Sequence, residues 1–556
     1  MASTNHSTCN RTSSSIGLKT GFCSETGIYH SLRPQVPLPS LTLPTSVTDF
    51  AFSLLHSSTI PPPSTAAVLD ATTHQSISFP ELIFRTKTLS FSLIHHLGLK
   101  KGDTAFVLSP NSLQIPILYF SLFSIGVVVS PSNPLSKSFE ISHQLQVSKP
   151  VIAFVTSDNA HKITSLKTII IDSMEFESLM TTQRSHPRID EREVKVYPSD
   201  PAAILYSSGT TGMVKGVLLT HQNFISSIVS AHAPMVARNT PVVSLCTVPY
   251  FHVYGFLYLV RSVSIGVTVV TMKRFELRTM LRAIEELRVT HVAVAPPLVV
   301  AMIKDGVVGE RYDLSSLEVI SCGGAPLRKS VITQFKKQFP KVQLAQAYGL
   351  TESTARVFSS LGPQESQVMG AIGKLAANCE AKIVDPDTGS SLSPGSPGEL
   401  WLRGASIMKG YVGDEEATAA VLDSEGWLKT GDLCYIDNEG FLFFVDRIKE
   451  LIKYKAYQVA PAELENLLLS HPDIVEAAII PYPDEEAGEV PMAFVVRQSG
   501  RFIEESHVMD FVSKQVASYK RIRRVCFIDS LPKNAQGKVL RKELIKLAVS
   551  SAISKL

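Results

Sequence analysis

The sequence predicts an α/β protein, with a large N-terminal domain of parallel-rich α/β subdomains plus a barrel-like subdomain, followed by a small α+β domain. Three observations support this class. The chain has 556 residues, 44% of them hydrophobic and 19% charged, which is too long for one hydrophobic core. Short apolar runs alternate with helical patterns through the middle, an order typical of parallel sheets. Proline and glycine then punctuate the region before Gly398, which favours short antiparallel strands.

The individual elements follow from the same pattern. The most apolar segment, Leu113–Val129, is interrupted by Gln114, Pro116 and several serines, so a buried helix and a strand fit better than a membrane span. The strand–loop–helix units are expected at 202–205 (strand), 292–295 (strand), 298–304 (helix), 317–320 (strand), 321–326 (loop) and 329–338 (helix). Ligands of such sheets bind at the strand ends.

A domain boundary is expected near Asp446. A strand over 441–445 precedes it, and a strand over 451–454 and a helix over 461–469 follow, with Pro461 well placed in the first helical turn. The predicted organisation is a disordered extension over residues 1–35, a large domain over 36–446 and a small domain over 447–556.

The two ends of the chain carry different signals. The first 35 residues are rich in Ser, Thr and Asn, and Glu25 is the only acid before residue 49; this composition predicts disorder and is faintly similar to a transit peptide. The last three residues, Ser554–Leu556, match the address read by the peroxisomal import receptor. We therefore expect a peroxisomal protein. The net charge of +3 gives no reason to expect nucleic-acid binding.

The most informative segment is Tyr206–Gly216, which reads YSSGTTGMVKG. Glycines let backbone amides approach an anion, hydroxyls donate further hydrogen bonds, and Lys215 adds a positive charge. A Ser/Thr/Gly cluster alone is typical of an ordinary loop. Here it follows an apolar strand, and its spacing differs from the P-loop motif, so the segment indicates a different kind of nucleotide-phosphate loop.

This loop resembles the signature of the adenylate-forming, acyl-activating enzymes, which include acyl-CoA synthetases, 4-coumarate:CoA ligases, peptide-synthetase adenylation domains and beetle luciferase. The segments Gly398–Gly404 (GELWLRG) and Tyr348–Glu352 (YGLTE) are similar to two further family motifs. The resemblance runs from about residue 50 to the C-terminus and is strongest to the plant 4-coumarate:CoA ligase-like group.

The resemblance implies a site for ATP and Mg²⁺. Segment Ser207–Lys215 would hold the β- and γ-phosphates, Glu352 would bind Mg²⁺ directly or through water, and Asp432 would accept both ribose hydroxyls. Arg447 would reinforce these contacts. The adenine pocket would be formed by residues 323–326 and 346–348. The expected nucleotide-binding residues are Ser207, Ser208, Gly209, Thr210, Thr211, Gly212, Lys215, Gln346, Tyr348, Thr351, Asp432, Arg447 and Lys449.

The resemblance also implies two half-reactions. Lys538 would bridge the acyl carboxylate and the α-phosphate during adenylation. The small domain would then swing as a mobile lid about a hinge at 447–450, and would present 452–458 instead. His252 would orient the acid and gate access of the thiol. The residues expected to serve the second step are Lys453 and Gln458 at the adenylate, with Arg274, Lys455 and Ala456 at CoA.

Departures from the family pattern bear on the acid. Leu257 stands where 4-coumarate:CoA ligases have an asparagine, and Ala347 and 353–355 alter the pocket floor. A site that lacks a polar partner for a ring hydroxyl does not select hydroxylated acids over acids without the hydroxyl. We therefore expect fatty, jasmonate-precursor or other apolar carboxylic acids as substrates.

Three alternatives stay open from the sequence. One is a 4-coumarate or cinnamate ligase proper, and another is an adenylate-former with an acceptor other than CoA, since Ala456 replaces the usual glycine beside the pantetheine path. The third is a non-catalytic nucleotide-binding relative. Intact Lys215, Glu352, Asp432 and Lys538 argue against the third.

Overall fold

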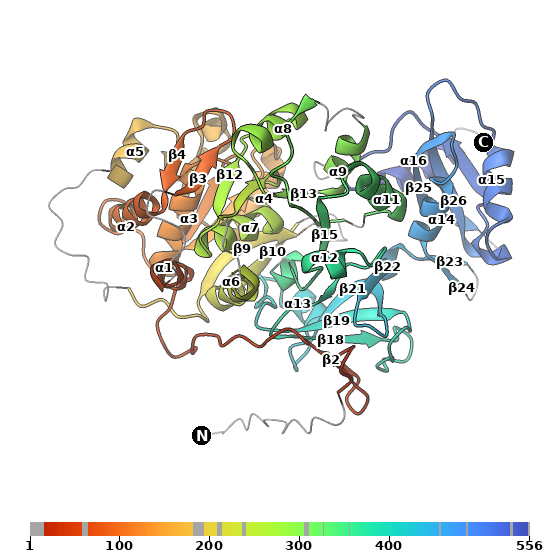
Figure 1. Ribbon diagram of the computed structural model, residues 1–556, viewed down its shortest axis with the longest axis horizontal. Helices are drawn as coiled ribbons and strands as arrows, with labels where there is room; N and C mark the ends of the chain where they lie inside the picture. The colour runs from red at the N-terminus through yellow and green to blue at the C-terminus, as the bar shows by residue number, and fades with distance from the viewer. Residues whose placement is uncertain are drawn as a thin grey trace.

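The computed structural model describes residues 16–57, 65–181, 194–207, 214–235, 241–304, 311–325, 327–354, 356–454, 457–484, 487–533 and 537–553. Within these residues the strands form four sheets. Three of them make up the larger part of the molecule, and the fourth lies in a C-terminal lobe, drawn in blue at the right of Figure 1. The predicted α/β class is confirmed.

A nine-stranded sheet has six neighbouring parallel strands, from β15 to β3. In spatial order its strands are β17 (Lys374–Leu375), β16 (Phe358–Ser359), β15 (Gln343–Tyr348), β14 (Val319–Cys322), β13 (His291–Val294), β11 (Val243–Cys246), β12 (Thr268–Thr271), β3 (Ala66–Asp70) and β4 (Ser76–Ser78). Helices α8 (Leu277–Glu286), α9 (Pro296–Lys304) and α11 (Lys329–Gln338) contribute to a core with these strands. Helix α9 begins at Pro296 rather than after the two prolines, because proline needs no hydrogen-bond partner in the first turn.

The second sheet has seven strands, parallel except for the hairpin of β9 with β10 and the edge strand β20. In spatial order these are β20 (Gly410–Tyr411), β10 (Lys215–Thr220), β9 (Pro201–Ser207), β6 (Val128–Ser132), β5 (Thr104–Leu108), β7 (Ile152–Val155) and β8 (Thr168–Ile170).

Five helices contribute buried side chains to the largest hydrophobic core, together with strands of the sheets. They are α1 (Val47–Ser57), α2 (Phe79–His95), α3 (Gln114–Ser124), α6 (His221–Met235) and α7 (Val253–Ser264). Residues 115–123 of α3 are all buried, and β6 follows, which confirms the prediction of a buried helix and a strand. The remaining helices before residue 446 are α4 (Ser138–Ser148), α5 (Met174–Thr181), α12 (Gly362–Ser366) and α13 (Glu415–Val421).

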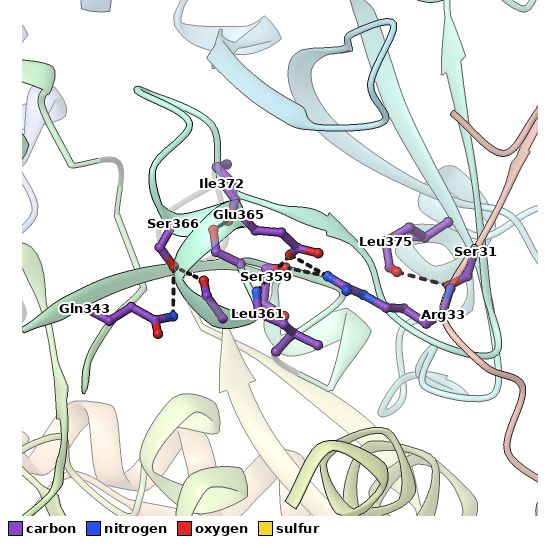
Figure 2. Close-up of polar contacts among 11 residues, drawn as sticks. Ser31, Arg33, Gln343, Ser359, Leu361, Glu365, Ser366, Ile372 and Leu375 are labelled. Atoms are coloured by element: carbon purple, nitrogen blue, oxygen red, sulfur yellow. Dashed lines mark hydrogen bonds and ion pairs between the residues drawn. The ribbon is translucent and has the colours of Figure 1, made fainter. Parts of the chain in front are cut away.

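The third sheet is antiparallel and contains the predicted short strands. Its order is β1 (Phe22–Cys23), β2 (Ile28–His30), β18 (Cys379–Val384), β19 (Gly398–Gly404), β21 (Leu428–Ile436) and β22 (Leu442–Arg447). The predicted disorder is therefore wrong for residues 16–35, because β2 pairs with β18 and Tyr29 is buried in the core. Figure 2 shows how the next residues are anchored: the Ser31 hydroxyl donates to the Leu375 carbonyl, and Arg33 pairs with Glu365 at 2.6 Å.

The chain passes from the third sheet to the C-terminal lobe through a short 3₁₀ turn, Ile448–Glu450. The fourth sheet consists of β24 (Tyr457–Val459), β23 (Ile452–Tyr454), β26 (Gly488–Arg497), β25 (Ile474–Asp484) and β27 (Arg524–Phe527). Helices α14 (Pro461–Leu468), α15 (Glu505–Ser513) and α16 (Arg541–Ile553) complete this lobe. Among the described residues, no helix is both long and apolar enough to cross a membrane.

Candidate functional site

A cavity of about 1420 Å³ lies where the three parts of the site meet. Its walls come from the hairpin ends of β9 and β10, from the loop after β15, and from the turn that leads into the C-terminal lobe. Among the residues predicted for the site, Ser207, Lys215, His252, Thr351, Glu352, Arg447, Lys449, Lys453 and Lys538 line it.

The hairpin of β9 and β10 holds the two ends of the predicted phosphate loop together. Ser207 pairs with Lys215 in the antiparallel register, so both side chains reach the cavity. The Lys215 ammonium lies 3.9 Å from a carboxylate oxygen of Asp414 and 4.8 Å from the centre of the Tyr411 ring. The predicted loop residues Ser208, Gly209, Thr210, Thr211 and Gly212 lie outside the described residues.

The loop after β15 places Thr351 and Glu352 in a 3₁₀ turn at the cavity wall. The Tyr411 hydroxyl donates to Oε1 of Glu352 at 2.9 Å and thereby orients the carboxylate. The described residues contain no cluster of three or more potential metal ligands. A single oriented carboxylate fits Mg²⁺, which takes substrate phosphates and water as its other ligands.

Asp432 is buried with 1% of its surface exposed. The Tyr348 hydroxyl donates to its Oδ2 at 2.6 Å. Its Oδ1 lies 3.3 Å from Nε of Arg447 but has no hydrogen-bond partner. Burial raises the pKa of this carboxyl. A buried oxygen without a partner is costly, so this one is suited to accept hydrogen bonds from a bound ligand such as a diol.

Three cations gather around Asp432. Burial, and then the charges of Arg447 and Lys538, lower the pKa of Lys449 to about 8. Burial and the charge of Arg447 also lower the pKa of Lys538. Cations held close together at a cavity indicate an anionic ligand, because like charges repel until an anion offsets them.

The loop that carries Lys538 is docked on the large part of the molecule. Gly537 has φ of +79°, and a Cβ atom there would lie 2.5 Å from Cγ of Pro297. Glycine suits this position for two reasons: the backbone is in the left-handed region, and Pro297 leaves no room for a side chain. The docking brings Lys538 to the same cavity wall as His252 and Thr351.

His252 caps the N-terminus of α7, where its Nδ1 accepts from the Tyr254 backbone N–H at 3.3 Å. Burial lowers the pKa of His252 to about 4, so the imidazole is neutral at pH 7. With Nδ1 as acceptor, the ring proton resides on Nε2. A neutral histidine at the cavity wall can position an acid without adding charge.

Gln346 and Arg274 are among the predicted residues that do not line the cavity. The Gln346 amide donates to the Ala371 carbonyl at 2.8 Å, and Arg274 is exposed after β12. Lys453 pairs with Gln458 in the hairpin of β23 and β24, and the Gln458 side chain is not described. Lys455 and Ala456 lie outside the described residues.

The sequence reasoning missed the ion pairs that join the connecting turn to the C-terminal lobe. Arg541 contacts Glu450 and Glu465, each at 2.6 Å. Oδ2 of Asp446 also accepts from the Ala462 backbone N–H at 2.9 Å. The sequence showed only that these residues are charged, because none of the pairings belongs to a recognisable motif that would indicate its partner.

A docked lysine loop, an oriented carboxylate and a cation cluster around a buried aspartate are the features that the sequence predicts for the site of an adenylate-forming enzyme. The chain belongs to the AMP-binding enzyme family: the model of this family matches residues 58–412, and the model of the AMP-binding enzyme C-terminal domain matches residues 463–538. It is an AMP-forming acid–thiol ligase, a class that uses ATP, Mg²⁺ and CoA.

Two curated plant relatives match over almost the whole length. The chain is 50% identical to 4-coumarate--CoA ligase-like 9 of Arabidopsis thaliana, covering 97% of this chain and 98% of that protein. It is 44% identical to peroxisomal OPC-8:0-CoA ligase 1 of the same species, covering 97% and 99%.

The fold is also similar to a solved bacterial synthetase. O-succinylbenzoate coenzyme A synthetase (MenE) from Bacillus subtilis, in complex with ATP and magnesium ion, matches with a TM-score of 0.75 and 29% identity, covering 89% of this chain and 99% of that one. The same synthetase with its acyl-adenylate intermediate gives a TM-score of 0.76 at the same identity, covering 89% and 97%.

Proposed function

We propose that this enzyme activates fatty, jasmonate-precursor or other apolar carboxylic acids as acyl-CoA thioesters. The observation that carries the proposal is the meeting of Lys538, Glu352 and His252 at one cavity. An acid oxygen attacks the α-phosphorus of ATP, the bond to pyrophosphate breaks, and acyl-AMP forms. The CoA sulfur then attacks the acyl carbon, and AMP leaves.

The roles of the residues follow from charge and position. Lys538 bridges the acid and the α-phosphate, and Glu352 would hold Mg²⁺, which would neutralise phosphate charge when bound. Oδ1 and Oδ2 of Asp432 accept from the ribose, and the segment Ser207–Lys215 binds the β- and γ-phosphates. We further propose that the lobe after residue 446 rotates about 447–450 for the second step. Because Glu450 lies at the end of this turn, its ion pair with Arg541 stays within the rotating part.

The preference for an apolar acid body is supported by α7. Leu257, five residues after His252, is apolar, 2% exposed and part of the largest core, so it offers no partner for a ring hydroxyl. The relative named peroxisomal OPC-8:0-CoA ligase 1 gives independent support. Hydroxycinnamic acids are therefore expected to be poor substrates.

The first experiment is an acid panel. Purified enzyme with ATP, Mg²⁺ and CoA is given fatty, jasmonate-precursor, benzoic and hydroxycinnamic acids, and acyl-AMP and acyl-CoA are measured by mass spectrometry. Acyl-CoA from the apolar acids is the expected result. Preferential use of hydroxycinnamic acids would assign a cinnamate ligase instead, and acyl-AMP without acyl-CoA would assign a different acceptor.

We propose that the enzyme acts in peroxisomes and is imported through the receptor that reads Ser554–Leu556. These residues lie outside the described part, and the support comes from the tripeptide and from the relative named as peroxisomal. A tagged chain without the tripeptide is expected to move to the cytosol in plant cells. Retention in the organelle would contradict this route, and a Leu556→Met chain serves as a conservative control.

ATP binding is expected to weaken as the pH rises above 8. The pKa of Lys449 is lowered to about 8 in the free enzyme, whereas a bound polyphosphate favours the charged form and raises it. Binding then takes up a proton, and the Kd for ATP rises by up to about tenfold per pH unit until the pKa of the bound form is reached.

Calorimetric titrations with ATP from pH 7 to 9.5 measure this dependence. Lys449→Met is expected to bind ATP more weakly at pH 7 and to lose much of the slope. Lys449→Arg, whose guanidinium stays charged, is expected to bind well at pH 9. An unchanged slope in Lys449→Met would assign the titration to another group.

A further inference from the structure

Arg261 and Arg356 lie close enough for their charges to interact, and among the described residues neither forms an ion pair with a carboxylate. Arg261 lies near the end of α7, and Arg356 lies just before β16. Both are partly buried, and the Nε atom of each is enclosed without a hydrogen-bond partner. Burial, and then the charge of Arg261, lower the pKa of Arg356 to about 9.

The groups nearest these arginines do not neutralise them. The Arg261 guanidinium lies 5.3 Å from the centre of the Tyr258 ring. The Tyr258 hydroxyl bonds to the Ser244 hydroxyl, and the Tyr254 hydroxyl donates to the Ser321 carbonyl at 2.8 Å. The groups that shift the pKa of Arg356 are arginines and tyrosines, with no acid among them.

A third arginine close by shows the contrast. Arg33 forms a 2.6 Å ion pair with Glu365 and also donates to the Ser359 carbonyl, as Figure 2 shows. Arg356 precedes Ser359 by three residues on the same segment. Within the described part of the chain, the protein thus supplies a carboxylate to Arg33, which follows β2, and none to Arg261 or Arg356. Even a partly buried cation with an enclosed, unpartnered Nε loses solvation that a counter-ion would restore, which points to an anionic ligand.

Arg261 and Arg356 lie on the same chain segments as residues proposed to contact the acid substrate and its phosphate partner. Helix α7 begins at the cavity with His252 and runs away from it, and Arg261 lies nine residues further along, about 14 Å of helix. Arg356 lies on the segment that leaves Thr351 and Glu352, and its charge interacts with Tyr254 and Arg261 of α7. The two arginines thus belong to the two segments that carry His252 and Glu352 to the cavity, although neither arginine itself lines it.

We propose that Arg261 and Arg356 form a subsite for a second carboxylate, at the end of the acid substrate opposite the carboxyl group that is activated. The proposal rests on the proposed function and adds to its substrates a preferred kind of acid, with an apolar body and a second carboxylate at the far end. Arginine is suited to this task, because its planar donors match a carboxylate and two guanidiniums can share one.

The test compares straight-chain dicarboxylic acids with monocarboxylic acids of equal carbon number, and with oxo acids that carry a ketone at the far end. The readout is kcat/KM for acyl-CoA formation. Wild-type enzyme is expected to prefer one dicarboxylic acid by about 10- to 100-fold over its monocarboxylic match. Arg356→Met and Arg261→Met are expected to lose that preference while they retain or increase activity on the monocarboxylic acid.

Matched variants exclude general damage. Arg288→Met removes an exposed arginine that pairs with Asp313 and is expected to leave the preference intact. Arg356→Lys keeps the charge and is expected to retain part of the preference. Thermal unfolding with the dicarboxylic acid alone gives a second readout, since the acid should raise the Tm of wild type but not of Arg356→Met.

The outcomes separate this inference from the proposed function. Equal use of mono- and dicarboxylic acids, with acyl-CoA formed from both, overturns the subsite and leaves the ligase in place. Preference for the oxo acid over the dicarboxylic acid overturns the assignment of a charged group. Absence of product from every acid overturns the proposed function, and the subsite with it.

Discussion

Lys538→Ala is expected to lower acyl-AMP formation by about 100- to 1000-fold, the usual effect of removing a group that stabilises charge in the transition state. It is expected to leave the transfer of a supplied acyl-AMP to CoA largely intact. Lys538 reaches the cavity through a loop docked at Pro297, and the proposed rotation withdraws it before the second step. Pyrophosphate release and thioester formation from synthetic acyl-AMP measure the two halves separately.

The matched control is Lys533→Ala on the same loop, since Lys533 pairs with Glu476 and does not line the cavity. Both half-reactions should stay near wild type in this variant. Equal losses in both half-reactions of Lys538→Ala would contradict the rotation and favour one pose for the whole reaction.

Asp432→Ala is expected to raise the KM for ATP by about 10- to 100-fold, because a charged acceptor and its two hydrogen bonds to the ribose are lost. The variant should also lose discrimination between ATP and 2′,3′-dideoxy-ATP, which wild type disfavours. A cycle that combines Asp432→Ala with removal of the ribose hydroxyls gives the interaction free energy between the two, separate from any effect of the substitution on the fold.

Tyr348→Phe provides the control for Asp432. It removes the hydroxyl that donates to Oδ2 but keeps the carboxylate, so a smaller rise in KM with preserved discrimination is expected. If Asp432→Ala still discriminates as wild type does, another residue binds the ribose and Asp432 serves the cation cluster alone.

Much of the fold could be predicted because its signals are local. The apolar run of α3, the strands near 292 and 319 and the first-turn proline of α14 are visible within windows of a few residues. The N-terminal pairing of β2 with β18 could not be predicted, because its partner lies about 350 residues away in the sequence. Composition alone therefore predicted disorder there.

Much of the candidate site was visible in the same way, as contiguous motifs that bring Ser207, Thr351, Glu352 and Lys538 to one cavity. The roles of these residues stay predictions that the variants above test. Gln346 was expected beside the adenine, but its amide is directed to Ala371, a choice set by the neighbouring loop rather than by the motif.

The sequence by itself determined the α/β class, the family and the nucleotide chemistry of this enzyme, because phosphate and ribose contacts come from short motifs at strand ends. Only the tertiary structure decided which charges share an environment. It brought Lys449 and Lys538 together around Asp432, and it brought Arg261 and Arg356 within reach of each other's charge with no counter-ion among the described residues. Such encounters depend on long-range packing, since the cost of burying a charge is set by neighbours that are distant along the chain.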